Sequence, residues 1–197
     1  MRIQPKYIQL VGDAVIPLAG FFFWNWSLYF ILLFYFLDVL ASEVIQHLKS
    51  AKIIDYQGKQ KKSIWRFYGI ISFFALVLVI SMIHFSLLLI QPSIHFLNEL
   101  VTFWTYEEFG IQQGFLLLPI IAFGAYQQYK LYFLVPARQR TTQLETSWQR
   151  HLKTFAFMAG VTGIISLTSL VIVLPEVAYV GLIVAGVAAY RFFFPRY

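Results

Sequence analysis

The chain has 197 residues, of which 59% are hydrophobic, 19% are aromatic and only 12% are charged. A soluble domain typically has about 25% charged residues, so this chain has too little polar sequence to cover a water-exposed surface. It contains no cysteine, which excludes disulfides, thiolate metal sites and iron–sulfur clusters. Because apolar runs recur along the whole length, residues 1–197 are predicted to form a single transmembrane helical domain.

Six apolar runs are predicted to cross a membrane as α-helices, because the central part of each is free of Lys and Arg, and Lys130 and Arg191 lie near the C-terminal ends of their runs. They cover residues 8–24, 27–48, 67–90, 114–134, 154–174 and 177–194. Pro17 is expected to kink the first run. Asn25 lies in a tight turn that makes an antiparallel hairpin of the first two runs, and Pro175-Glu176 joins the last two. The predicted fold class is therefore all-α, a polytopic integral membrane protein with six transmembrane helices.

Three connecting segments have patterns of their own. Residues 50–63 are predicted to form a polar, lysine-rich loop in which Gly58 breaks any helix, and residues 135–153 a second basic loop with a short helix along the membrane. In residues 93–111, the apolar positions 96, 97, 100, 103 and 104 recur at helical spacing. This spacing predicts an amphipathic helix on the outer membrane face.

The net charge of +6 indicates topology rather than a nucleic-acid partner, because the fifteen Lys and Arg residues lie in four clusters outside the apolar runs or near their ends. Six spans place all four clusters on one side of the membrane. The opposite side receives Glu99, Glu107, Glu108 and Glu176. The positive-inside rule then predicts cytoplasmic N- and C-termini in the cytoplasmic (inner) membrane. The expected partners are the lipid bilayer and other membrane protein subunits or a second copy of the chain.

Asp38 is the most conspicuous polar residue of the second run. It lies about 16 Å from the outer end of that run at about 1.5 Å per residue, close to the bilayer midplane. An acid at this depth is costly and often marks function. Two interpretations are open: a proton-carrying or ligand-binding carboxylate, or a hydrogen-bonded acid that fastens the second span to its neighbours.

Other polar positions are candidates for the same kinds of role. Glu43 and His47 are four residues apart on the second run, so they share a helix face. Asp13 on the first run is expected at similar depth, which predicts a cytoplasm-facing cluster of Asp13, Glu43 and His47. For His84 in the third run the preferred interpretation is a hydrogen-bonded packing residue, and the alternative is a metal-binding or proton-carrying role. The four histidines show no metal-ligand spacing.

Motifs of membrane-embedded enzymes are incomplete in this sequence. The pair Glu107-Glu108 matches the start of the motif of intramembrane prenyl-type proteases, but the arginine and the Phe-x-x-x-His that should follow are missing. The Gly-x-Ser-Gly motif of rhomboid proteases and glycine-rich phosphate loops are missing too. We therefore expect no enzymatic activity, no cofactor and no metal site.

Small residues recur at helix-packing spacing in the last two runs. They are Ala156, Gly160 and Gly163 in the fifth run and Gly181, Ala185 and Ala189 in the sixth. Small residues at this spacing permit close approach of two transmembrane helices. Packing of the fifth span on the sixth is the first expectation, and a seam between subunits is the alternative.

The first two runs contain Pro17, Gly20, Trp26 and the stretch Tyr35-Phe36-Leu37-Asp38. This pattern resembles a family of small polytopic membrane proteins of bacteria and archaea. Its members have a proline in the first span, a glycine and a tryptophan near the turn, and a Tyr-Trp-x-Glu-like motif in the second span. Phe36 stands in place of the tryptophan and Asp38 in place of the glutamate. The resemblance implies that the acid at position 38 is a shared feature of the family, and it implies no activity.

Two classes of function follow from these patterns. The first is a non-enzymatic accessory or scaffold subunit of a membrane complex. The second is a small transporter or ion- or proton-translocating protein that uses Asp38, with Glu43, Asp13 and His84 as relay partners. A relay acid must reach water from at least one side, whereas a structural acid should be dry and bonded to a neighbouring helix.

Overall fold

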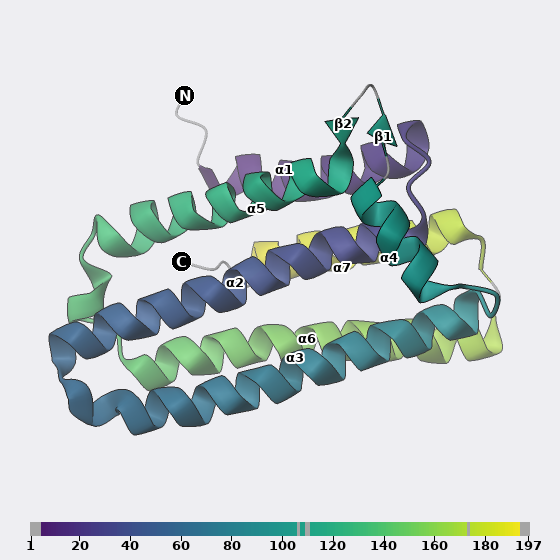
Figure 1. The fold of residues 1–197 in the computed structure, drawn as a ribbon. Helices are drawn as coiled ribbons and strands as arrows, with labels where there is room; N and C mark the ends of the chain where they lie inside the picture. The colour runs from purple at the N-terminus through teal and green to yellow at the C-terminus, as the bar shows by residue number, and fades with distance from the viewer. Residues whose placement is uncertain (1–4, 106, 109–110, 173, 194–197) are drawn as a thin grey trace.

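Long helices lying side by side form an elongated bundle in the computed structural model (Figure 1). In chain order they are α1 (Pro5–Phe23), α2 (Leu28–Gln57), α3 (Lys62–Ile90), the short α4 (Phe96–Thr105), α5 (Gln113–Tyr129), α6 (Leu144–Val171) and α7 (Glu176–Phe193). The structure describes the backbone of residues 5–105, 107–108, 111–172 and 174–193, and the side chains of residues 11–58, 60–105, 114–172, 174–190 and 192. Within these residues the predicted all-α class is confirmed.

Helix α2 is longer than the apolar run that predicts it. It begins after Asn25, whose φ of 49° makes the turn, and the Ser27 hydroxyl caps it by accepting a hydrogen bond from the Phe30 N–H at 3.2 Å. It ends at Gly58, whose φ of 110° favours glycine. The predicted loop at 50–63 is therefore wrong over most of its length. A single 3₁₀ turn, Lys59–Lys61, connects α2 to α3.

The second basic segment is also helical over half of its length. Helix α5 continues into a π-helical turn, Lys130–Leu134, and a 3₁₀ turn, Arg138–Arg140, follows Ala137 with its φ of 52°. Helix α6 begins at Leu144 and runs unbroken to Val171. Residues 144–153 thus belong to this long helix, and the expected separate helix along the membrane is wrong.

A small core explains both extensions. Ile53 and Ile54 of α2 are buried against Leu144 and Trp148 of α6, together with Phe133 and Tyr129. These apolar positions recur at helical spacing beyond the ends of the continuous apolar runs. Burial of their side chains stabilises the added turns through the hydrophobic effect.

Helix α4 crosses the bundle at the end where α3 finishes and α7 begins (Figure 1). The predicted helix is confirmed over residues 96–105. Its buried face carries Phe103, whose ring centroid lies 4.5 Å from that of Phe30, and its other face exposes Leu97 and Val101. Two short antiparallel strands, β1 (Glu107–Glu108) and β2 (Ile111–Gln112), lead into α5.

Helix α2 is the central helix of the bundle and contacts each of the other helices directly. Around it, α1 packs mainly against α7, α3 mainly against α6, and α5 mainly against α2. The largest core lies where α2 meets α4 and α7, around Trp26, Phe30 and Tyr179. The 3₁₀ connection after α2 and the connection from α5 to α6 lie at the opposite end of the bundle from α4 (Figure 1).

The surface of the bundle is apolar over much of its length. Large exposed side chains include Phe73, Phe74 and Leu78 on α3 and Leu167 and Leu170 on α6. Contiguous apolar surface of this kind marks a membrane- or protein-facing region. Three helices, α2, α3 and α6, are long and apolar enough to cross a membrane, and shorter apolar segments lie at Val11–Phe23 and Glu176–Tyr190. These helices indicate a membrane location.

The small residues of the last two helices face away from the expected interface. Ala156 and Gly160 of α6 are exposed, and a Cβ at Gly160 would have open space around it. Gly181, Ala185 and Ala189 of α7 are exposed as well. Since α6 packs mainly on α3 and α7 mainly on α1, the expectation that these residues bring α6 and α7 together is wrong.

Candidate functional site

Glu43 accepts hydrogen bonds at both carboxylate oxygens. His47 Nε2 lies 3.1 Å from Oε1, while the Ser72 hydroxyl lies 2.7 Å and His151 Nε2 2.5 Å from Oε2. His47 lies on α2 with Glu43, Ser72 lies on α3 and His151 on α6. Three helices therefore meet at one carboxylate, and we call these four residues with Trp65 the Glu43 cluster.

The hydrogen bond from Trp65 defines the tautomer of His47. The Trp65 indole nitrogen, which is only a donor, lies 2.8 Å from His47 Nδ1. His47 Nδ1 must therefore be the acceptor, so its proton lies on Nε2 and is donated to Glu43. Ser72 donates its hydroxyl hydrogen to the other oxygen. This arrangement fits an ionised Glu43 carboxylate beside a neutral His47.

Aromatic side chains enclose the cluster. The His47 ring lies 5.2 Å from the ring of Trp148 and 5.9 Å from that of Trp65, and the His151 ring lies 5.1 Å from that of Phe155. The Glu43 side chain is 14% exposed and that of His151 is 7% exposed, whereas His47 is 40% exposed. The carboxylate is thus partly shielded, and His47 is its most accessible partner.

Sequence reasoning found one pair of the cluster and missed the rest. The predicted pairing of Glu43 with His47 on one helix face is confirmed. Ser72 and His151 were missed because a serine in an apolar run carries no distinctive pattern and because His151 falls in a segment predicted as loop. The four-residue spacing of the apolar residues Leu144 and Trp148 was the available signal. It indicates that the helix begins before His151, so that His151 lies within α6.

Asp13 lies outside the Glu43 cluster. The Tyr35 hydroxyl donates to the Asp13 backbone carbonyl at 2.8 Å, and Tyr35 precedes Glu43 by eight residues on α2. That separation is about 12 Å along a helix. The prediction that Asp13 joins Glu43 and His47 in one cluster is therefore wrong. Asp38 is half-buried on α2, about 7.5 Å along the helix from Glu43.

His84 acts as a link between helices at the other end of the bundle. Its Nε2 lies 3.2 Å from the Tyr29 hydroxyl of α2, and its Nδ1 lies 2.9 Å from the Ile80 carbonyl. The ring also lies 4.6 Å from that of Phe96 on α4. With both nitrogens and one face in contact with protein atoms, His84 has the environment of a packing histidine.

Two glutamates at that end hold the start of α2. Glu99 of α4 accepts a hydrogen bond from the Ser27 hydroxyl at 2.8 Å. Glu176, the first residue of α7, accepts one from the Leu28 N–H at 3.1 Å. The first amide groups of a helix have no partner within the helix and favour negative charge nearby. Both carboxylates therefore stabilise the N-terminus of α2.

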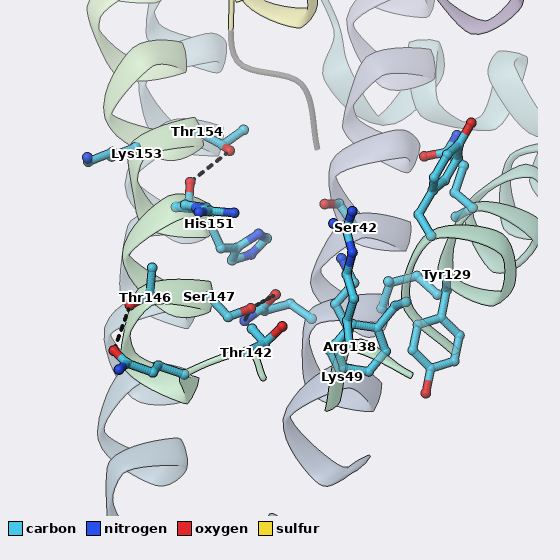
Figure 2. Close-up of a pocket in the computed structure, with 18 of the residues that line it drawn as sticks. Ser42, Lys49, Tyr129, Arg138, Thr142, Thr146, Ser147, His151, Lys153 and Thr154 are labelled. Atoms are coloured by element: carbon cyan, nitrogen blue, oxygen red, sulfur yellow. Dashed lines mark hydrogen bonds between the residues drawn. The ribbon is translucent and has the colours of Figure 1, made fainter. Parts of the chain in front are cut away.

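A cavity of about 860 Å³ adjoins the Glu43 cluster. It lies between α2, the end of α5 and α6, and Figure 2 shows Ser42 and Lys49 on one side with Ser147, His151 and Thr154 on the other. His151 lines this cavity and also contacts Glu43. Gln46 and Ser147 hydrogen-bond to each other within its wall, at 3.0 Å from Gln46 Nε2 to Ser147 Oγ.

The chemistry of the Glu43 cluster is that of a hydrogen-bonded interhelical link. In a nucleophilic triad a histidine lies between the acid and the hydroxyl, whereas here the Ser72 hydroxyl donates directly to the acid. Carboxylates and histidines can also exchange protons, and His47 and His151 are the groups through which Glu43 would do so. Across the described side chains, no group of three or more His, Asp or Glu residues could hold a metal ion.

Comparison with protein-family models, with curated proteins and with solved structures found no match to this chain.

Proposed function

We propose that this chain is a non-enzymatic integral membrane protein that serves as an accessory or scaffold subunit of a membrane complex. In this proposal six helices, α1 to α3 and α5 to α7, cross the cytoplasmic membrane, and both termini are cytoplasmic. The single observation that carries the structural role is the bonding of Glu43, whose two oxygens are occupied by partners from its own helix and from α3 and α6. An acid bound in this way fastens helices together.

The outward faces of α6 and α7 fit assembly with another membrane helix. Gly181, Ala185 and Ala189 form an exposed stripe at four-residue spacing on α7, and a Cβ at Gly181 would meet nothing. In a bilayer, small residues at this spacing let a second helix approach closely, which strengthens van der Waals packing. This stripe supports the alternative that the sequence left open, a seam between subunits.

The test is purification of the tagged protein from its own cells in a mild detergent, followed by mass spectrometry of the proteins that accompany it. We expect a stoichiometric membrane partner or a second copy of the chain. Ala185→Leu should weaken that association, because leucine fills the space that a partner helix would use. Ala122→Leu on the exposed face of α5 is the matched control and should leave it unchanged. Recovery of the wild-type chain as a lone monomer would reject the subunit proposal.

The second candidate is translocation of a proton or ion. The observation in its favour is that His151, which contacts Glu43, lines the cavity, so the cluster has a polar approach from one side. In this alternative Asp38 is the carrier nearest the midplane, with Glu43, Asp13 and His84 as relay partners. Flux into proteoliposomes that is lost in Asp38→Asn and Glu43→Gln would favour it. If protein-free liposomes show the same flux as proteoliposomes that contain the wild-type protein, translocation is excluded.

A further inference from the structure

The cavity beside the Glu43 cluster is lined by positive charge. Lys49, Arg138, Arg150 and Lys153 all border it, from α2, from the 3₁₀ turn after α5 and from α6. Among the residues that the structure describes, no Asp or Glu lines it. A hollow bordered by one sign of charge concentrates its electric field and attracts counter-ions.

Three of these four cations have no ion-pair partner among the described residues. Among the described residues, Arg138, Arg150 and Lys153 form no ion pair, because the ion pairs of that part of the chain join Glu43 to His47 and His151. All three side chains are exposed and so can turn toward a ligand. Lys49 lies 5.9 Å from the ring centroid of Phe133 at the cavity wall. The positive charge of Arg138, Arg150 and Lys153 is therefore available to an outside anion.

Neutral hydrogen-bonding groups supplement the charges. Tyr129, Tyr132 and Thr142, which carry hydroxyls, and Gln128, which carries an amide, are among the residues that line the same cavity. Arginine and lysine with hydroxyl and amide donors are the partners that phosphate oxygens prefer. The volume of about 860 Å³ lies within the range of small-molecule sites, about 300–1,000 Å³.

We propose that this cavity binds a phosphate-bearing anion. Arg138, Arg150 and Lys153 contribute the charge and Lys49 lies at the wall. Basic pockets between membrane helices on the cytoplasmic side are typical sites for anionic lipid headgroups. The same chemistry would hold a soluble organic phosphate that enters from water. Binding at this cavity does not depend on assembly with a partner subunit.

The experiment measures binding to the purified full-length protein in a neutral detergent by native mass spectrometry. The probes are phosphatidylglycerol, phosphatidylcholine as the zwitterionic lipid, and glycerol 3-phosphate as the soluble phosphate. The test variant is the triple Arg138→Gln, Arg150→Gln, Lys153→Gln. The matched control is the triple Lys52→Gln, Lys62→Gln, Arg66→Gln, which removes the same charge from exposed residues that do not line the cavity.

We expect the test triple to lose at least about tenfold in affinity for the bound phosphate, because its three residues line the cavity and each contributes to headgroup attraction. The control triple should change little, because its residues lie outside the cavity. Preference for phosphatidylglycerol over phosphatidylcholine would identify a lipid source, and competition by glycerol 3-phosphate a soluble one. Equal loss in both triples, or no binding of any probe to the wild type, would overturn the proposal. Arg138→Gln against Lys62→Gln repeats the comparison with single changes if a triple variant does not fold.

Discussion

At the scale of single residues, Glu43 illustrates how an acid is tolerated within an apolar helix bundle. Removing a carboxylate from water is costly unless hydrogen bonds and opposite charges replace the lost hydration. His47, Ser72 and His151 provide hydrogen bonds to it, with their donor atoms within 3.1 Å of its oxygens. The same contacts hold α2 against α3 and α6, so the polar residue contributes to the packing of its neighbours.

Glu43→Gln should destabilise the bundle by about 1–2 kcal/mol, because the amide nitrogen cannot accept the hydrogen bonds that the carboxylate oxygen accepts. The free energy of unfolding can be measured in mixed micelles with increasing sodium dodecyl sulfate, followed by circular dichroism. Asp55→Asn makes the same chemical change at an exposed position of α2 and should alter stability by less than about 0.5 kcal/mol. Equal effects of the two substitutions would contradict a role for Glu43 in linking the helices.

How much of the site could be predicted depended on how far apart its residues lie in the sequence. The Glu43–His47 pair follows from helical spacing alone, because both residues lie on one helix. His151 lies 108 positions from Glu43, and only the packing of α6 beside α2 brings the two together. The prediction that Asp13 lies level with Glu43 was also wrong. It used the distance of each residue from a charged segment, and that distance does not define the register between two helices.

At the scale of elements, the apolar runs located the helices but not their ends. Continuous hydrophobicity predicted the centres of α2 and α6, because those parts are predominantly apolar. Beyond them the helices become amphipathic, and Ile53 and Trp148 are buried while Lys52 and Gln149 are exposed. A search for long apolar stretches cannot detect that change of pattern, whereas a search for helical periodicity can.

The contact between α4 and α5 depends on a glycine. A Cβ at Gly114 would overlap the backbone carbonyl of Phe103, so the two helices could not keep their present separation. We expect Gly114→Ala to destabilise the protein by about 1–3 kcal/mol through this overpacking. Gly124→Ala on the same helix meets open space and should stabilise the helix by about 0.5–1 kcal/mol.

Thermal unfolding of the two glycine variants, followed by circular dichroism in the same detergent, compares them directly. Because both positions lie on α5 and receive the same methyl group, the difference isolates the contact with Phe103. If the Gly114→Ala protein unfolds at or above the wild-type temperature, α4 can move away from α5 without loss of stability, and the prediction is wrong.

At the scale of the whole molecule, the proposed topology places the two ends of the bundle on opposite sides of a membrane. The 3₁₀ turn after α2 and the connection from α5 to α6 lie at one end, and α4 lies at the other (Figure 1). The sequence predicted this separation from the distribution of Lys and Arg. The way the helices pair could not be predicted, because all of them have apolar surfaces that differ little in composition.

Single cysteines introduced into this cysteine-free chain test the topology. We expect Thr102→Cys on α4 to react with a membrane-impermeant maleimide added to intact cells. Gln60→Cys, in the 3₁₀ turn after α2, should react only after the membrane is permeabilised. The unmodified chain is the background control. Labelling of both cysteines, or of Gln60→Cys alone, in intact cells would reject cytoplasmic termini with six spans.

The contact between the first and the last helix has a consequence for biosynthesis. Helix α1 packs mainly on α7, and Glu176 caps the start of α2 across 148 positions of sequence. In the proposed topology, a ribosome delivers α1 and α2 to the membrane before it makes α7, so both helices remain in the lipid for that time without their final neighbour. The bundle closes only after α7 has been made. In that topology, a nascent chain released before residue 176 exposes an unfinished seam to membrane proteases, and a chain that includes α7 does not.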